Sequence, residues 1–380
     1  AGYQTAFFGK YVNDYPAGAS LDFVPPGWNR WAAAIYDDFY KQYNYSMNED
    51  GKQVRYNQAS TDYFTDVLAR KSVAFIDEAH EANRPLALIV APSAPHIPTV
   101  AAPRHRTLFA TAKAPRPASF QEANTRDKPP FNRFGMMSQT KISNIDKEYG
   151  GRLRMLAAAD ELIVGIVDAL RKRDILEQTF IMVTSDHGYH MGQHNMTPQK
   201  KTAYEEDTRI PLLVRGPGIP RGTRLRHVVV NNDLAPTLVD LGKGKVPPGL
   251  DGRSFAPLLG QTPPDPVKWR RSLLIERLPL GEMPPPPPAK PPTTEYDCIT
   301  GATTAAIIPE YAAVRTPTYT YVEYVTGDRE LYDNAKDPNQ LTNIYCKAST
   351  TLQSTLAGLV SRLKTCTGDT CNSAENEVVK

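Results

Sequence analysis

One uninterrupted strand-like segment limits the folds open to this 380-residue chain more than any other feature. Phe180-Ile-Met-Val-Thr-Ser185 shows no alternation of polar and apolar residues and follows an amphipathic stretch at residues 153–172. A strand that is apolar on both faces is typical of a parallel sheet covered by helices on both sides. The segment therefore predicts an α/β fold with a central, mostly parallel sheet.

Strands and helices alternate through the first two thirds of the chain. Apolar runs bounded by Gly, Pro or charged residues predict buried strands at residues 5–8, 86–91, 180–185 and 212–215. Apolar residues at helical spacing predict helices at residues 60–80, 153–172 and 233–241. Residues 14–51 are punctuated by aromatic residues, Gly and Pro and are predicted to be a loop, and residues 99–140 have no assignment.

The composition changes near residue 260. A run of five prolines at residues 284–288 cannot form a core element. Beyond it, residues 311–315 and 319–324 predict an antiparallel hairpin, and residues 350–364 predict a helix. We therefore expect an α/β core over residues 1–262 and a C-terminal subdomain over residues 263–380 with a small antiparallel sheet and a helix.

Charge and cysteine content narrow the class of protein. The net charge is only +3, from 44 basic and 41 acidic residues, so no nucleic-acid partner is expected. No run of 18 apolar residues occurs, so no membrane span is expected. Cys366 and Cys371 are close enough for a small disulfide loop, whereas the other two cysteines form either a second bridge or free thiols. With glycosylation sequons at Asn44 and Asn195, these cysteines favour a secreted or lysosome-like location.

Polar side chains follow two of the predicted strands. Lys10 and His96 come after the strands at 5–8 and 86–91, and Lys200 lies farther along the chain. Ligands of open α/β sheets bind beyond the carboxyl ends of the strands, so these residues are candidates for a site. The two lysines could neutralise a tetrahedral anion, and His96 could act as a general acid or contact the anion. Solvated lysines and a structural loop histidine are the alternatives.

Asp186 and three histidines follow the strand at 180–185. A carboxylate at the end of an apolar strand predicts either a ligand for a hard cation such as Ca²⁺ or a turn or helix-capping residue. His187, His190 and His194 lie within eight residues, which fits either a transition-metal site or ordinary hydrogen-bonded loop histidines. Residue type and spacing alone do not decide whether Asp186 is a cation ligand or a turn residue. They also do not decide whether the histidines bind a metal or only form hydrogen bonds in a loop.

Several segments of the sequence together resemble the sulfatase family. Thr184-Ser-Asp186-His187-Gly188-Tyr-His-Met-Gly-Gln193 is similar to the family's metal-binding motif. Lys200-Lys-Thr-Ala-Tyr204-Glu205 resembles its Lys-x-x-x-Tyr-Glu segment, and Gly9-Lys10 and Pro95-His96 resemble two further motifs. The similar segments run in the family's order through nearly the whole chain. Gly9-Lys10-Tyr11-Val12-Asn13 is most similar to fungal arylsulfatases and glucosamine-6-sulfatases.

The resemblance implies an alkaline-phosphatase-like α/β fold and hydrolysis of an aryl or sugar sulfate ester. It implies that Asp186 and His187 bind calcium. It also implies that Lys10, His96 and Lys200 contact the sulfate group and carry catalysis, so the expected partner is a small sulfate ester or a sulfated glycan. Calcium and lysines can stabilise the charge that develops as the S–O bond breaks.

Two departures from the family pattern affect these expectations. The family's nucleophile is a formylglycine made in a Cys/Ser-x-Pro/Ala-x-Arg motif, and these 380 residues contain no such motif and no upstream Asp-Asp pair. We therefore expect the chain to be a fragment or a processed product that is inactive by itself. His187 stands where many relatives have Asn, and imidazole is a poorer calcium ligand than an amide oxygen.

Two other functions stay open. A phosphodiesterase of the same superfold would act on a similar tetrahedral group, but it would need more His and Asp ligands than these motifs supply. A catalytically inactive protein could use the same lysines and His96 to bind anionic glycans. The oligomeric state has no signal in the sequence.

Overall fold

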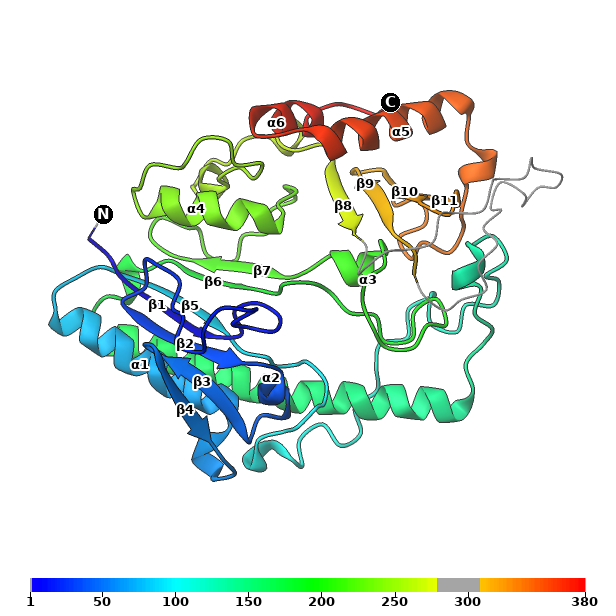
Figure 1. Cartoon of the computed structure of the whole chain (residues 1–380). Coiled ribbons are helices and arrows are strands. Elements are labelled where there is room, and N and C mark those ends of the chain that lie inside the picture. Colours follow the sequence, from blue (N-terminus) through cyan, green and yellow to red (C-terminus); the bar gives the residue numbers. More distant parts are fainter. Residues whose placement is uncertain (1, 279–307, 380) are drawn as a thin grey trace. The chain divides into compact units, whose positions relative to one another are not determined.

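The computed structural model describes residues 2–278 and 308–379, which form two compact units (Figure 1). The first unit comprises Ala1–Ala114 and Ser143–Phe180, and the second comprises Pro115–Ile142 and Ile181–Lys380. The division expected at residue 262 stays a prediction, and the five-proline run lies outside the described residues. Within the described residues, no helix is long and apolar enough to cross a membrane.

The first unit contains a mixed five-stranded sheet in the order β4-β3-β2-β1-β5. Its strands are β1 (Gln4–Gly9), β2 (Arg30–Ile35), β3 (Tyr45–Glu49), β4 (Lys52–Tyr56) and β5 (Leu86–Ala91). β1 runs parallel to β2 and to β5, whereas β2, β3 and β4 pair antiparallel. The predicted α/β class is confirmed, with a mixed sheet.

Alternation along β1 separates two cores in the first unit. Ala6 and Phe8 belong to the cluster that packs against helix α1 (Phe64–Glu81). Phe7 belongs to the opposite cluster and stacks on Trp31 of β2 at 4.9 Å between ring centroids. Both faces of β1 are therefore covered by apolar side chains.

Two predictions for the first unit need correction. Residues 14–51 are not a loop throughout, because they contain β2 and β3. The Ala-rich segment of β2 has little strand propensity of its own, and its pairing with β1 decides its conformation. The helix expected from residue 153 is α2 (Gln139–Lys172), which begins 14 residues earlier than its apolar periodicity indicated.

In the second unit, the apolar segment near residue 180 forms a different pairing from the one expected. β6 (Ile181–Thr184) pairs antiparallel with β7 (Leu212–Arg215) in a two-stranded sheet. The expectation that this strand joins a parallel sheet is not met by the pairings of the described residues. An apolar pattern reports burial and does not specify the direction of a neighbouring strand. Short helices α3 (Glu205–Thr208) and α4 (Leu234–Leu241) follow.

The second unit also contains the expected C-terminal antiparallel sheet, with the order β11-β10-β9-β8. The predicted hairpin is confirmed as β9 and β10, and β11 is an additional strand. Leu356 and Leu359 belong to the helix predicted at 350–364 and lie in the cluster that joins it to the sheet. The elements are β8 (Leu273–Arg277), β9 (Tyr311–Arg315), β10 (Tyr319–Tyr324), β11 (Arg329–Asp333), α5 (Thr350–Thr365) and α6 (Asp369–Glu375).

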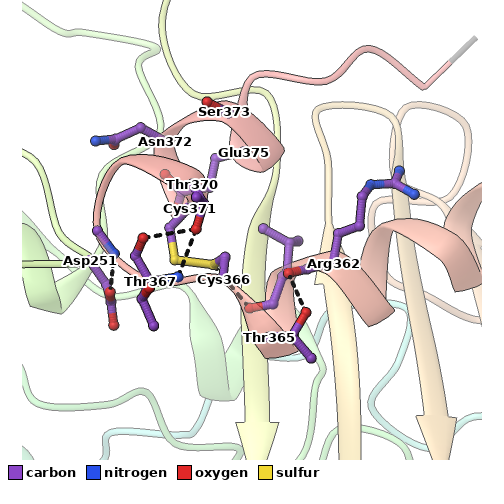
Figure 2. The surroundings of a disulfide bond; sticks show 12 residues. Asp251, Arg362, Thr365, Cys366, Thr367, Thr370, Cys371, Asn372, Ser373 and Glu375 are labelled. Atoms are coloured by element: carbon purple, nitrogen blue, oxygen red, sulfur yellow. Dashed lines mark hydrogen bonds between the residues drawn. A yellow bond between two sulfur atoms is a disulfide. The ribbon is translucent and has the colours of Figure 1, made fainter. Parts of the chain in front are cut away.

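A disulfide closes the turn between α5 and α6 (Figure 2). Cys366 is bonded to Cys371, as predicted, and the backbone N–H of Gly368 inside this loop donates to Asp251 Oδ1 at 2.7 Å. Cys346 is also disulfide-bonded, and Cys298 lies outside the described residues. Asn195, the acceptor residue of the second sequon, is fully buried, so its side chain is not accessible to glycosylation in the fold.

Candidate active site

Parallel pairing of β1 and β5 brings two of the predicted site residues to one edge of the first unit's sheet. Gly9 pairs with Ala91, and the backbone N–H of Lys10 donates to the carbonyl of Ala91 at 2.8 Å. Gly9 has φ +123°, and a Cβ there would lie 2.1 Å from the Ala91 oxygen, so only glycine fits. Lys10 therefore follows the strand at a fixed position, and the loop that carries His96 begins beside it.

An aromatic ring links these two residues. Tyr40 stacks on the imidazole of His96 at 4.2 Å between ring centroids, and Lys10 Nζ lies 5.6 Å from the centroid of the Tyr40 ring. A cation at that distance from an aromatic face is attracted by the ring quadrupole. We call Lys10, Tyr40 and His96 the Lys10 cluster. The sequence analysis missed Tyr40, and the only available signal was the density of aromatic residues in the segment predicted as a loop.

Three further predicted residues meet in the second unit. His187 donates a hydrogen bond from Nδ1 to the Gly188 carbonyl at 2.8 Å, which leaves Nε2 as the acceptor nitrogen. Lys200 Nζ lies 2.5 Å from this Nε2, and Asp186 Oδ2 lies 3.3 Å from it. The Asp186 side chain is 72% exposed, so its carboxylate is open to ligands. We call Asp186, His187 and Lys200 the Lys200 cluster.

Asp186 and His187 have a spacing suitable for two ligands of one cation. Calcium ligands lie about 2.3–2.6 Å from the ion, so two ligand atoms at right angles would be about 3.4 Å apart. The observed 3.3 Å between Asp186 Oδ2 and His187 Nε2 matches this value. The pair would supply two of the roughly six to eight ligands that calcium takes. No three His, Cys, Asp or Glu side chains in residues 2–278 and 308–379 form a group that could hold a metal ion.

Buried Asp207 fixes both ends of the loop that carries the Lys200 cluster. Its backbone carbonyl accepts the N–H of Gly188 at 2.8 Å, next to His187. Its carboxylate accepts Thr202 Oγ1 at 2.7 Å and bonds to His190 Nδ1 at 2.9 Å. Asp207 therefore ties the backbone next to His187 to the backbone near Lys200. No sequence signal separated Asp207 from the two neighbouring acidic residues.

The remaining two histidines of the sequence cluster have separate structural roles. His190 is buried against Asp207, and His194 is buried with Nδ1 2.8 Å from Glu122 Oε2. Burial lowers the pKa of His194 well below its usual value, and burial raises the pKa of Glu122 to about 7. Because the rings bond to different carboxylates, the described residues do not form the transition-metal site that was one alternative for His187, His190 and His194.

The predicted residues thus fall into two groups. Lys10 and His96 belong to the first unit, and Asp186, His187 and Lys200 belong to the second. Each group combines cationic or imidazole side chains, which suit an anion, and the second adds a carboxylate, which suits a metal ion.

Comparison with known proteins identifies the family. The sequence model of the sulfatase family matches residues 1–244. A putative extracellular sulfatase Sulf-1 homolog from Caenorhabditis elegans is 37% identical over 296 residues, which cover 75% of this chain and 40% of that protein. N-acetylglucosamine-6-sulfatase from Capra hircus is 33% identical over 394 residues, which cover 98% of this chain and 68% of the goat enzyme.

The fold has a counterpart among solved structures. The structure of BT4656 in complex with its substrate D-glucosamine-2-N,6-O-disulfate superposes with a TM-score of 0.75 at 21% identity, covering 99% of this chain and 81% of that one. This similarity shows the alkaline-phosphatase-like fold. The chain spans less than half of the nematode relative and about two thirds of the goat enzyme. The family model and the identity to the goat enzyme together show that the chain belongs to the sulfatase family, whose members are sulfuric ester hydrolases.

Proposed function

We propose that the protein hydrolyses sulfate esters of an amino sugar. Lys10, His96 and Lys200 contact the sulfate group, and Asp186 and His187 bind calcium beside it. The observation that carries this proposal is the Lys200 cluster, in which an ammonium, an imidazole and an exposed carboxylate converge inside the segment matched by the family model. Family membership supports a metal requirement, because sulfatases are generally metal-dependent.

The residues of the two clusters suit separate parts of this chemistry. Lys10 and Lys200 provide positive charges for the sulfate oxygens, whose negative charge grows as the S–O bond breaks. His96, which Tyr40 holds in place, donates a proton to the leaving oxygen or a hydrogen bond to the ester. Bound calcium would add Lewis-acid polarisation of the sulfate. The formylglycine nucleophile has no candidate motif in these 380 residues, so turnover requires a nucleophile that they do not supply.

The relatives support an amino-sugar substrate and an extracellular or secretory location. The goat relative is named for N-acetylglucosamine 6-sulfate, and the substrate of BT4656 is a glucosamine sulfated at O6. The nematode relative is named as an extracellular sulfatase, and the disulfide between Cys366 and Cys371 is stable in an oxidising compartment. We therefore propose a 6-sulfated glucosamine residue of a glycan as the substrate, and an aryl sulfate as the assay surrogate.

Sulfate release from N-acetylglucosamine 6-sulfate, followed by ion chromatography, tests the proposal. The protein expressed from its complete coding sequence should release sulfate in a calcium-dependent way, and the corresponding 6-phosphate should be a poor substrate. Asp186→Ala should remove the calcium response, and an unchanged calcium titration would refute its role as a ligand. Binding of the sulfated sugar without any release would instead support the inactive glycan-binding protein.

A further inference from the structure

We propose that Lys200 and the metal ion compete for His187, so that metal binding displaces Lys200 from the imidazole and makes its ammonium available to the sulfate group. The inference rests on the proposed function, because it takes His187 as a metal ligand. It adds an order of events, in which the metal ion binds before Lys200 reaches the anion.

The hydrogen bonds of His187 leave one nitrogen for two partners. Nδ1 carries the ring proton, because it lies 2.8 Å from the Gly188 carbonyl, which can only accept. Nε2 then has a single lone pair, which Lys200 Nζ uses at 2.5 Å. A metal ion bound through Nε2 needs the same lone pair, so Lys200 and the ion cannot both bond to this nitrogen.

Charge repulsion also favours displacement of Lys200 when the metal ion binds. An ion about 2.3–2.6 Å from His187 Nε2 would lie within about 5 Å of an ammonium that is 2.5 Å from the same atom. Two cations that close repel each other strongly in a partly buried site. Asp186, 3.3 Å from Nε2, has one carboxylate that can balance only part of this charge.

Lys200 is the partner able to move. Residues on both sides of the contact are fixed to Asp207, through the backbone N–H of Gly188 at 2.8 Å and the backbone N–H of Thr202 at 2.9 Å. The imidazole is additionally held by its own bond to the Gly188 carbonyl. The lysine side chain has four rotatable bonds beyond the backbone and can swing without disturbing these contacts.

Calcium titration, by calorimetry, of the protein expressed from its complete coding sequence tests the competition without depending on turnover. Lys200→Met keeps the length of the side chain and removes the charge, and Lys201→Met is the matched control, because Lys201 is an exposed neighbour. We expect Lys200→Met to lower the calcium Kd about tenfold and Lys201→Met to leave it within about twofold of wild type. Thermal unfolding shows whether the Met variant folds. If it does not, the calcium Kd of Lys200→Gln tests the same expectation.

The outcomes separate the inference from the proposed function. An equal or weaker affinity in both Lys200 variants, with calcium still bound by the wild type, overturns the competition and leaves the metal site standing. Calcium binding by Lys200→Met where the wild type binds none supports the competition. Absence of binding in every variant overturns the competition together with the proposed metal site. His187→Ala should abolish binding, and retention of full affinity in that variant overturns the role of the imidazole in both.

Discussion

The Lys10 cluster and the Lys200 cluster hold their functional residues by different means. In the first, Lys10 is fixed by strand register, and His96 stacks on the ring of Tyr40. In the second, the backbone beside His187 and near Lys200 is held through hydrogen bonds of Gly188 and Thr202 that converge on buried Asp207. A polar network in a buried site is stable only when all of its members are satisfied. We therefore expect the second cluster to be the more sensitive to single substitutions.

The largest expected effect tests whether both clusters serve the same reaction. Lys200→Ala and His96→Ala should each lower kcat/KM for the complete enzyme by about 10³-fold or more, because each removes a group that stabilises charge in the transition state. Steady-state kinetics with a sulfated glucosamine measures this. Near-normal turnover in either variant would remove that residue, and its cluster, from the sulfate site.

The next effect concerns stability and tests the dependence of the Lys200 cluster on its network. Asp207→Asn replaces one carboxylate oxygen by a donor that faces either His190 or Thr202. Leaving such a buried donor unsatisfied should lower the free energy of unfolding by about 3 kcal/mol. Denaturation followed by circular dichroism measures the change. Asp240→Asn is the control, because Asp240 is exposed and accepts a hydrogen bond from Ser254 Oγ, so this change should cost less than about 1 kcal/mol.

A pH-dependent effect concerns buried Glu122, which forms a hydrogen bond with His194. Burial raises the pKa of Glu122 to about 7 from 4.5, with Lys128 opposing the shift. Between these values the folded state keeps a proton that the unfolded state has lost, so this group makes the protein less stable as pH rises from about 4.5 to 7. Glu122→Gln should therefore gain stability relative to wild type over this range. Thermal melts of both proteins at matched pH values measure the difference, and parallel curves would contradict the raised pKa.

Much of the fold could be predicted because its helices and strands have strong local patterns. The apolar runs at β1, β5, β6 and β7 and the periodicity of α5 identified these elements directly. β2 could not be found, because its Ala-rich segment becomes a strand only by pairing with β1. The antiparallel pairing of β6 with β7 could not be predicted either, since an apolar strand does not encode the direction of its neighbour.

The residues of the candidate site likewise divide into those that the sequence identified and those that it did not. Lys10, His96, Asp186, His187 and Lys200 stand in motifs at strand ends or in one loop, so residue type and order were enough to select them. The residues that position them, Tyr40 and Asp207, act through contacts between segments 30 and 56 residues apart or through a turn buried in the fold. Such contacts depend on tertiary packing, which a single sequence does not show.

The smallest expected effect tests whether the Lys10 cluster depends on an aromatic face rather than on a polar network. Tyr40→Leu removes the ring that stacks on His96 and attracts Lys10, and should lower kcat/KM about tenfold, since the two contacts are together worth about 1.5 kcal/mol. Tyr40→Phe keeps the ring and should retain activity within about twofold. Kinetics of both variants, with thermal unfolding to confirm folding, make the comparison. Equal losses in Leu and Phe variants would show that the hydroxyl matters, and the contrast between the two clusters would then fail.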